Sequence, residues 1–97
     1  MDREELLGIV RRGLPDLMAR YGVLHLDLFG SFARGEAGPG SDVDFLVSFL
    51  GEPTFHSYMG LKEDLESLLD RRVDLVTLTG LKPRIRAAVL AELYRVA

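Results

Sequence analysis

The chain has 97 residues, a formal net charge of -3 and no cysteine. This length predicts one small domain spanning residues 1–97, and the acidic balance argues against a protein that binds nucleic acid through a basic surface. Disulfides and thiol chemistry are excluded. Because we find neither a signal peptide nor a long apolar span, we expect a cytoplasmic protein that does not enter a membrane.

Two helical segments are predicted before the first strand. Residues 2–12 carry acidic side chains first and basic ones last, as a helix dipole prefers. Residues 13–15, Gly-Leu-Pro, predict a break or kink, with Pro15 in the first turn of a second helical piece. That piece runs to Tyr21, and Gly22 ends it.

The first predicted strand, residues 23–29, leads straight into a sharp turn at Gly30 and Ser31. Alternation places two groups on opposite faces of the strand: Leu24, Leu26 and Leu28 on one, and His25, Asp27 and Phe29 on the other. The missing side chain of Gly30 would admit a phosphate, and Ser31 offers a hydroxyl where a helix begins and free N–H groups attract anions. Arg34, one turn later, could reach the same phosphate or be only a surface salt-bridge partner.

Two acids follow on the next predicted strand. A Gly/Pro-rich turn leads to residues 41–47, where alternation puts Asp42 and Asp44 on one face and the apolar residues on the other. Neighbouring carboxylates repel, so either one keeps its proton at neutral pH or a hard divalent cation such as Mg²⁺ relieves the repulsion. Such a pair alone can also be a solvated strand edge. The Gly-Ser pair at this distance upstream favours the metal site.

The rest of the chain predicts a helix, a strand and a helix. Thr54 is the expected N-cap of a helix over about 55–69, residues 72–77 form the third strand, and a last helix runs over 84–94. The expected inward-facing residues of the two helices are Tyr58, Leu61, Leu65, Leu68 and Leu69, then Ile85, Val89 and Leu93. Strands interspersed with helices predict an α/β sheet.

The order Gly30-Ser31, ten residues, then Asp42-x-Asp44 on an apolar strand resembles the signature of the polymerase-beta-like nucleotidyltransferases, in particular their minimal, single-domain members. The resemblance spans residues 23–78. It implies an α+β fold with a mixed β-sheet flanked by helices, rather than a purely parallel sheet. It also implies a third acid on a later strand, and Asp74 is the candidate, although taken alone it is compatible with an ordinary strand-face acid.

The chemistry implied by this resemblance is metal-assisted nucleotidyl transfer. Asp42, Asp44 and Asp74 would be the catalytic carboxylates and the ligands of two Mg²⁺ ions, with Mn²⁺ as an alternative. Asp74 would lie nearest the acceptor hydroxyl, either as general base or only as a metal ligand. The ATP phosphates would be held by Gly30, Ser31 and Arg34.

No acceptor site is visible in the sequence, so the second substrate must either meet an exposed active site or be supplied by another chain. We therefore expect a partner, within a homo- or hetero-oligomer. Minimal nucleotidyltransferases of this kind are commonly paired with a HEPN-domain toxin, and some transfer AMP from ATP to a tyrosine of that partner. The resemblance therefore implies a protein adenylyltransferase that acts as a type VII-like antitoxin. The alternatives are a catalytically weak antitoxin that neutralises its partner by binding, or a small-molecule nucleotidyltransferase.

Overall fold

The computed structural model describes residues 1–97 and opens with one long helix, α1 (Arg3–Tyr21). The Asp2 side chain caps its start by accepting a hydrogen bond from the Glu5 N–H, and Gly22 ends it at φ +67°. The predicted break at residues 13–15 is wrong, because Pro15 lies inside a continuous helix. The apolar face that begins at Leu6 continues through Leu14 and Leu17, so burial against the rest of the domain outweighs the hydrogen bond that proline removes.

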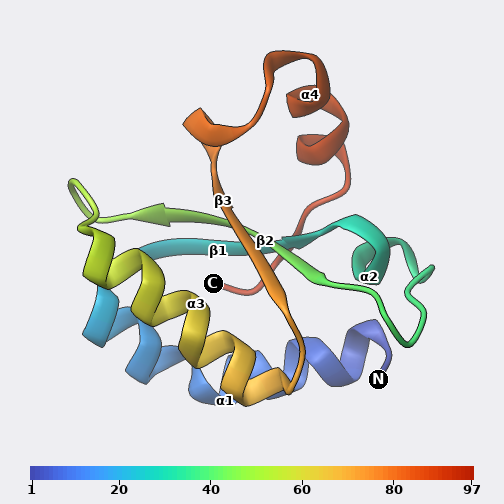
Figure 1. Cartoon of the computed structure of the whole chain (residues 1–97), viewed down its shortest axis with the longest axis horizontal. Coiled ribbons are helices and arrows are strands. Elements are labelled where there is room, and N and C mark those ends of the chain that lie inside the picture. The colour runs from blue at the N-terminus through green and yellow to red at the C-terminus, as the bar shows by residue number, and fades with distance from the viewer.

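A four-stranded mixed sheet forms the middle layer, in the order β3-β2-β1-β4 (Figure 1). Its strands are β1 (Val23–Phe29), β2 (Val43–Phe49), β3 (Val73–Thr77) and β4 (Tyr94–Arg95). β1 runs antiparallel to both β2 and β4, whereas β2 and β3 are parallel. The expected mixed sheet flanked by helices is therefore confirmed.

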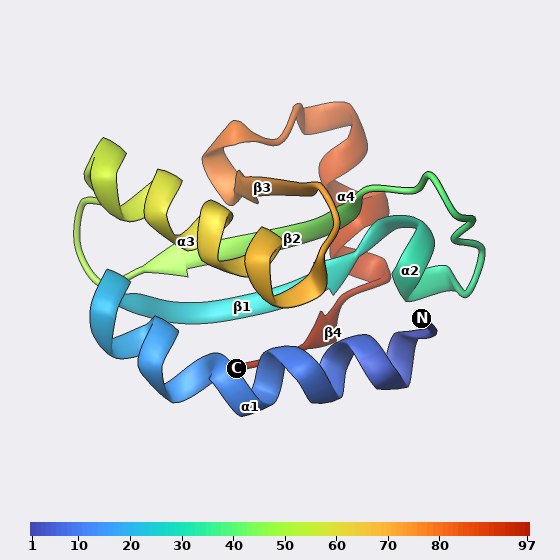
Figure 2. The same cartoon turned by 60° about the horizontal axis from the view of Figure 1, so that its bottom comes forward.

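Helices cover the two faces of this sheet unequally. α1 and α3 (Phe55–Leu69) lie together across one face, and α4 (Pro83–Ala91) lies on the other side (Figures 1 and 2). Thr54 caps α3 as predicted, and it does so in a reciprocal pair with Ser57. No helix combines the length and the apolar character that crossing a bilayer requires.

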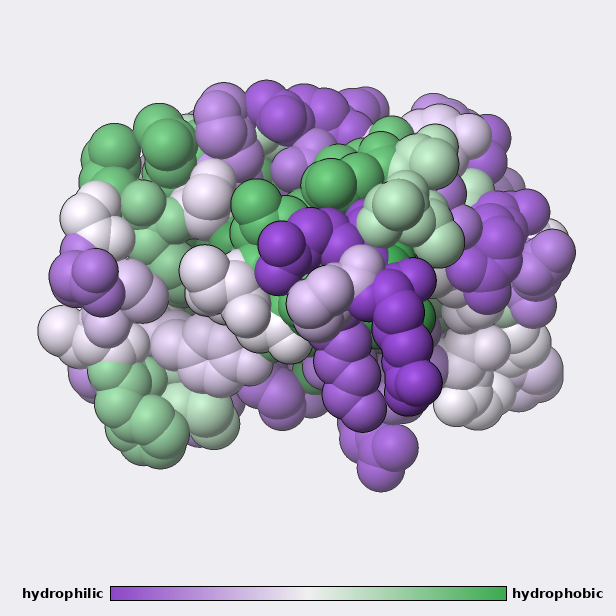
Figure 3. Space-filling model, turned by 90° about the horizontal axis from the view of Figure 1, so that it is seen from above, coloured by the Kyte–Doolittle hydropathy of each residue, from purple (hydrophilic) through white to green (hydrophobic).

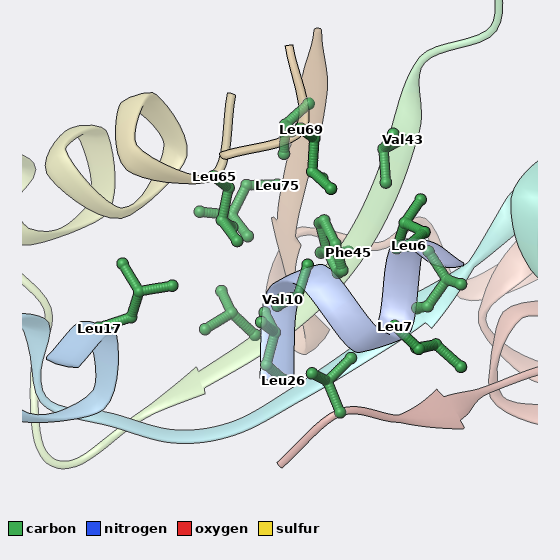
Figure 4. Packing of buried hydrophobic residues seen from close by; sticks show 14 of the residues in the cluster. Leu6, Leu7, Val10, Leu17, Leu26, Val43, Phe45, Leu65, Leu69 and Leu75 are labelled. Carbon is green, nitrogen blue, oxygen red and sulfur yellow. The ribbon is translucent and has the colours of Figure 1, made fainter. Parts of the chain in front are cut away.

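The main core lies between the sheet and the helices α1 and α3 (Figure 4). Its fully buried side chains include Leu6, Val10, Leu26, Val43, Phe45, Leu61, Leu65 and Leu75. Because Val43, Phe45 and Val47 point into this core, the alternate residues of β2 face the other side. This alternation directs Asp44 away from the core.

β1 departs from simple alternation. A register irregularity between Val23 and His25 shifts its pairing with β2, so Val23 is buried while Leu24 is 43% exposed. The prediction that Leu24 shares the inner face with Leu26 and Leu28 is therefore wrong. Asp27 is only 5% exposed, and its Oδ1 accepts a hydrogen bond from Arg95 Nε at 2.8 Å.

The C-terminal part differs most from prediction. α4 ends at Ala91 instead of continuing to residue 94, and Tyr94 and Arg95 form β4, a strand that was not predicted. Val89 packs with Leu46 and Leu81 in a small second cluster, whereas Ile85, predicted to face inward, is 44% exposed.

The side of the molecule that carries α4 and the short 3₁₀ helix η1 (Leu78–Gly80) presents a mixed surface. Hydrophobic and hydrophilic residues lie side by side there (Figure 3). Leu78, Ile85 and Leu90 are each more than 40% exposed. Apolar side chains are thus accessible on this side of the sheet.

Candidate active site

The parallel register of β2 and β3 brings two of the predicted acids together. Asp44 and Asp74 are direct Cα partners, and adjacent strands lie only about 4.8 Å apart. Because both residues occupy equivalent positions in the pleat, their side chains leave the same face of the sheet. Asp42 lies just before the first residue of β2, and its negative charge acts on Asp44. The structure therefore brings the three predicted acids together at the beginning of β2 and β3.

Asp44 has a strongly perturbed acidity. Partial burial, followed by the negative charges of Asp74 and Asp42, raises its pKa from 3.8 to about 6, and Glu92 adds to this effect. The positive charge of Arg34 opposes the shift. The repulsion predicted from the Asp-x-Asp pattern is thus present, although burial of the carboxyl is the larger cause.

The carboxylates do not yet converge on one point. Asp42 Oδ1 accepts a hydrogen bond from Arg72 Nε at 3.3 Å, and no group of three or more acidic or histidine side chains is arranged to hold an ion. The donor set nevertheless fits, since Mg²⁺ prefers carboxylate oxygens. Asp42 would have to leave Arg72, and because the Arg72 side chain is 84% exposed, breaking this ion pair costs little.

Gly30 lies directly against the acids. Its φ of +77° is left-handed, and a Cβ built on it would lie 2.1 Å from Asp44 Oδ2. The sequence predicted that the missing side chain leaves room for a phosphate. In the structure the Asp44 carboxylate uses that room. Gly30 is therefore needed for the close approach of the turn to the acidic strand.

The turn continues as the short helix α2 (Gly30–Arg34), in which Ser31 is the second residue. The Ser31 carbonyl accepts a hydrogen bond from the Glu36 N–H at 2.9 Å, while its hydroxyl has no hydrogen-bond partner within the chain. The helix ends at Gly35, with φ +73°. The Ser31 hydroxyl is thus available to a ligand.

Arg34 forms two salt bridges. Its Nε donates to Glu36 Oε1 at 2.8 Å, and its Nη1 donates to both oxygens of Glu92 at 3.1 and 3.3 Å. In the ligand-free chain Arg34 is therefore a salt-bridge partner, the plainer of the two roles that the sequence suggested. Its side chain remains 45% exposed, within reach of solvent.

Glu92 is the site residue that sequence reasoning missed. Its Oε1 accepts a hydrogen bond from the Gly30 N–H at 3.0 Å, besides pairing with Arg34. The residue caps the end of α4, and the unexpected strand β4 brings it back to the turn. The aromatic and β-branched residues Tyr94 and Val96 were the only local signal that this segment turns from helix to strand.

An open cleft of about 300 Å³ lies beside Asp42, lined by residues 39–42 and 70–72. Its walls include Arg71 and Arg72 but no hydrophobic side chain. A separate groove between α1 and α3, around Arg20 and Asp64, contains none of the three acids. The clefts of the chain thus include no apolar pocket for a small acceptor beside the acids.

A mixed sheet with acids on neighbouring parallel strands, and a glycine turn packed on one of them, defines the class of nucleotidyl-transferring α+β domains. Residues 10–95 match the family model described as a nucleotidyltransferase domain. The chain belongs to this family, so both the fold and the enzyme class predicted from the motif are confirmed.

Two comparisons extend over nearly the whole chain. The protein adenylyltransferase MntA of Thermococcus cleftensis is 43% identical over 93 residues, which cover 96% of this chain and 94% of that protein. A solved structure described as a candidate minimal nucleotidyltransferase is 45% identical, with a TM-score of 0.81, covering 97% of this chain and 95% of the other. The chain is thus of the minimal nucleotidyltransferase type.

A more distant likeness concerns the fold alone. A chain from the structure of a tri-AMPylated Shewanella oneidensis HEPN toxin in complex with an MNT antitoxin is 21% identical, with a TM-score of 0.68. The match covers 98% of this chain and 71% of that one. The same arrangement of helices and strands therefore recurs at low sequence identity.

Proposed function

We propose that this protein transfers AMP from ATP to a hydroxyl group of a partner protein in a metal-dependent reaction. The partner is a HEPN-domain toxin, its acceptor is a tyrosine, and the modification makes this chain an antitoxin. The similarity to a protein named adenylyltransferase supports the reaction, and the HEPN complex among the fold neighbours supports the partner.

One observation carries the proposal: Asp44 lies between the Gly30 turn and Asp74. The turn contacts Asp44 from one side, and the register of β2 and β3 sets Asp74 beside it on the other. A nucleotide whose phosphates lie over the turn would thus have its reacting phosphorus next to the acids.

Asp42, Asp44 and Asp74 are the residues that would hold Mg²⁺ or Mn²⁺. When bound, two such ions would neutralise the charge of the triphosphate and stabilise the attacking and leaving oxygens. The raised pKa of Asp44 fits this role, because a cation would take the place of the proton that the crowded carboxylates otherwise favour.

The other roles belong to the chain's own side chains. The free hydroxyl of Ser31 and the guanidinium of Arg34 would bind the β- and γ-phosphates. In the reaction the acceptor oxygen forms a bond to the α-phosphorus of ATP, the bond to the bridging oxygen breaks, and pyrophosphate leaves. Asp74 is exposed, so an acceptor could reach its carboxylate, which would either take the acceptor proton or complete the metal site.

The surface around the acids favours a protein acceptor. The cleft beside Asp42 is open and lined mainly by polar and charged residues, so it offers no enclosed pocket for a small acceptor. Exposed Leu78, Ile85 and Leu90 lie on the side of the sheet that carries α4, where a partner chain can cover them.

The test is to incubate the protein with a HEPN-domain partner, ATP and Mg²⁺, and to measure the intact mass of the partner. We expect a gain of one or more AMP groups, located on tyrosine by fragmentation and absent in EDTA. If the partner is bound and neutralised without any gain in mass, the protein acts by steric contact and the proposed reaction is wrong.

A further inference from the structure

Glu92 binds two groups at the turn over which the proposed function places the nucleotide phosphates: the Gly30 N–H, and Arg34, which is assigned to those phosphates. Its Oε1 accepts hydrogen bonds from the Gly30 N–H at 3.0 Å and from Arg34 Nη1 at 3.1 Å. One carboxylate of the chain therefore joins the glycine turn to the arginine. The side chain is only 26% exposed, so it is packed into this position.

The register of β4 fixes this placement. β4 pairs antiparallel with β1 through Asp27 with Arg95 and Leu28 with Tyr94. Gly30 follows the last residue of β1, and Glu92 caps the end of α4 just before β4. Pairing of β4 with β1 therefore brings the backbone of Glu92 close to the turn, where its side chain can contact Gly30.

A phosphate and the Glu92 carboxylate cannot both use these groups without strong repulsion. The Gly30 N–H has a single proton to donate, and two anions at this turn would also face the acids Asp42, Asp44 and Asp74. Arg34 has five N–H donors and can change partners, because its Nε bond to Glu36 is independent of Glu92.

We propose that Glu92 competes with the nucleotide for the glycine turn. In the free enzyme its carboxylate binds the Gly30 N–H and Arg34 where a phosphate would bind. When the triphosphate binds, Glu92 leaves the Gly30 N–H, and Arg34 binds the phosphates instead. The inference rests on the proposed function, since it assumes that the triphosphate binds at the glycine turn. Its consequence is a lower nucleotide affinity than the same turn would have without Glu92.

The experiment measures the affinity of the full chain by calorimetry for two probes, ATP with Mg²⁺ and inorganic tripolyphosphate in EDTA. The variants are Glu92→Ala and, as a matched control, Glu36→Ala. Glu36 is the other carboxylate that binds Arg34, but its side chain is 65% exposed and it does not contact Gly30. Both variants remove one negative charge next to Arg34, but only Glu92→Ala frees the Gly30 N–H.

We expect Glu92→Ala to bind both probes roughly tenfold more tightly, as freeing a hydrogen bond to a charged group predicts. Glu36→Ala should stay within about twofold of wild type, as expected for an exposed ion pair. Wild-type or weaker ATP affinity in a folded Glu92→Ala protein would overturn the inference while leaving the proposed function intact. If neither wild type nor Glu92→Ala binds ATP, the proposed function fails and the inference with it.

Glu92→Gln keeps the test decisive if the alanine variant does not fold. The glutamine oxygen can still accept the hydrogen bond from Gly30, but the negative charge is gone, so a smaller gain in affinity of the same sign is expected. Weaker ATP binding by Glu92→Gln would show that Glu92 assists the nucleotide, which contradicts the proposal. The amide resonance of Gly30 provides a second readout: it should move in ligand-free Glu92→Gln but not in Glu36→Ala.

Discussion

Gly30 and Asp44 are in such close contact that a methyl group on Gly30 would overlap the Asp44 carboxylate, with 2.1 Å between its Cβ and Asp44 Oδ2. Glycine is therefore required at position 30 for two reasons: its φ is +77°, and the turn approaches the acidic strand too closely for a side chain.

Gly30→Ala should destabilise the protein more than Gly35→Ala does. Gly35 has a similar φ of +73° but open space where a Cβ would lie, so alanine there meets only backbone strain. We expect about 1 kcal/mol for Gly35→Ala and about 2–4 kcal/mol for Gly30→Ala, measured by urea unfolding.

Combining Gly30→Ala with Asp44→Ala separates the cost of backbone strain from the cost of overlap with the Asp44 carboxylate. Removing the carboxylate should bring the cost of Gly30→Ala closer to that of Gly35→Ala, because the 2.1 Å overlap disappears and only the backbone strain and a 3.1 Å contact with the Cβ of residue 44 remain. Equal costs of Gly30→Ala in the two backgrounds would refute the contact between Gly30 and Asp44.

Asp44→Asn should stabilise the ligand-free protein at neutral pH. The pKa of Asp44 is raised to about 6 in the folded chain by burial and by its acidic neighbours. Between about pH 4 and 6 the folded state therefore binds more protons than the unfolded chain, so this carboxyl lowers stability as the pH rises through that interval. Above pH 6 the full penalty remains, and below pH 4 it vanishes.

Urea unfolding at pH 4.0 and pH 7.5 tests this dependence. The shift from 3.8 to about 6 belongs to a partly exposed group, so we expect Asp44→Asn to gain about 1–2 kcal/mol at pH 7.5 after allowance for solvent screening. The gain should disappear at pH 4.0. A gain of equal size at both pH values would show that it does not come from the ionised carboxylate.

The acidic half of the site could be predicted from the sequence because it depends on local patterns. Alternation along one strand predicted that Asp42 and Asp44 lie together, and glycine at position 30 itself predicted a sharp turn. Asp74 needed the family resemblance, since nothing local tells which strand pairs with β2. The structure then placed it beside Asp44.

The part of the site that contains Glu92 depends on the pairing of distant segments, and it was not predicted. Glu92 lies far along the chain from Gly30, and a helix continued through residue 94 would have carried the residues after Glu92 away from the turn. Pairing of β4 with β1 ends α4 early and reverses the chain. Likewise, the packing of α1 against the core, not its local sequence, keeps Pro15 inside a continuous helix.

Arg95→Leu should destabilise the fold because it removes the charge partner of the buried Asp27 carboxylate. Asp27 is 5% exposed, and Arg95 Nε is its partner at 2.8 Å, so removing the arginine leaves a buried carboxylate without its charge partner. Because Arg95 itself is half exposed and water can partly replace it, we expect a loss of about 1–3 kcal/mol. Thermal and urea unfolding would measure this loss.

The matched control for Arg95→Leu is Arg84→Leu, which removes the same charge from an exposed position on α4. It should change stability by less than about 0.5 kcal/mol. The double variant Asp27→Asn with Arg95→Leu should recover part of the loss, since no charge is then buried. A loss of the same size in both arginine variants would contradict the role given to Asp27.

The central claim is that the three acids catalyse AMP transfer to a partner, and Asp74→Asn tests it most directly. This variant retains Asp42 and Asp44 and loses the exposed carboxylate that we propose lies nearest the acceptor. Partner binding and much of the ATP binding should therefore remain while transfer is lost. Glu63→Gln, an exposed acid on α3 across the sheet, is the control.

The decisive measurement is the intact mass of the HEPN-domain partner after incubation with each variant, ATP and Mg²⁺. The account predicts an AMP adduct with wild type and with Glu63→Gln, and none with Asp74→Asn. It also predicts that only the variants that form the adduct protect cells at antitoxin-to-toxin ratios well below one. Equal protection by Asp74→Asn and wild type, with no adduct in either case, would contradict it.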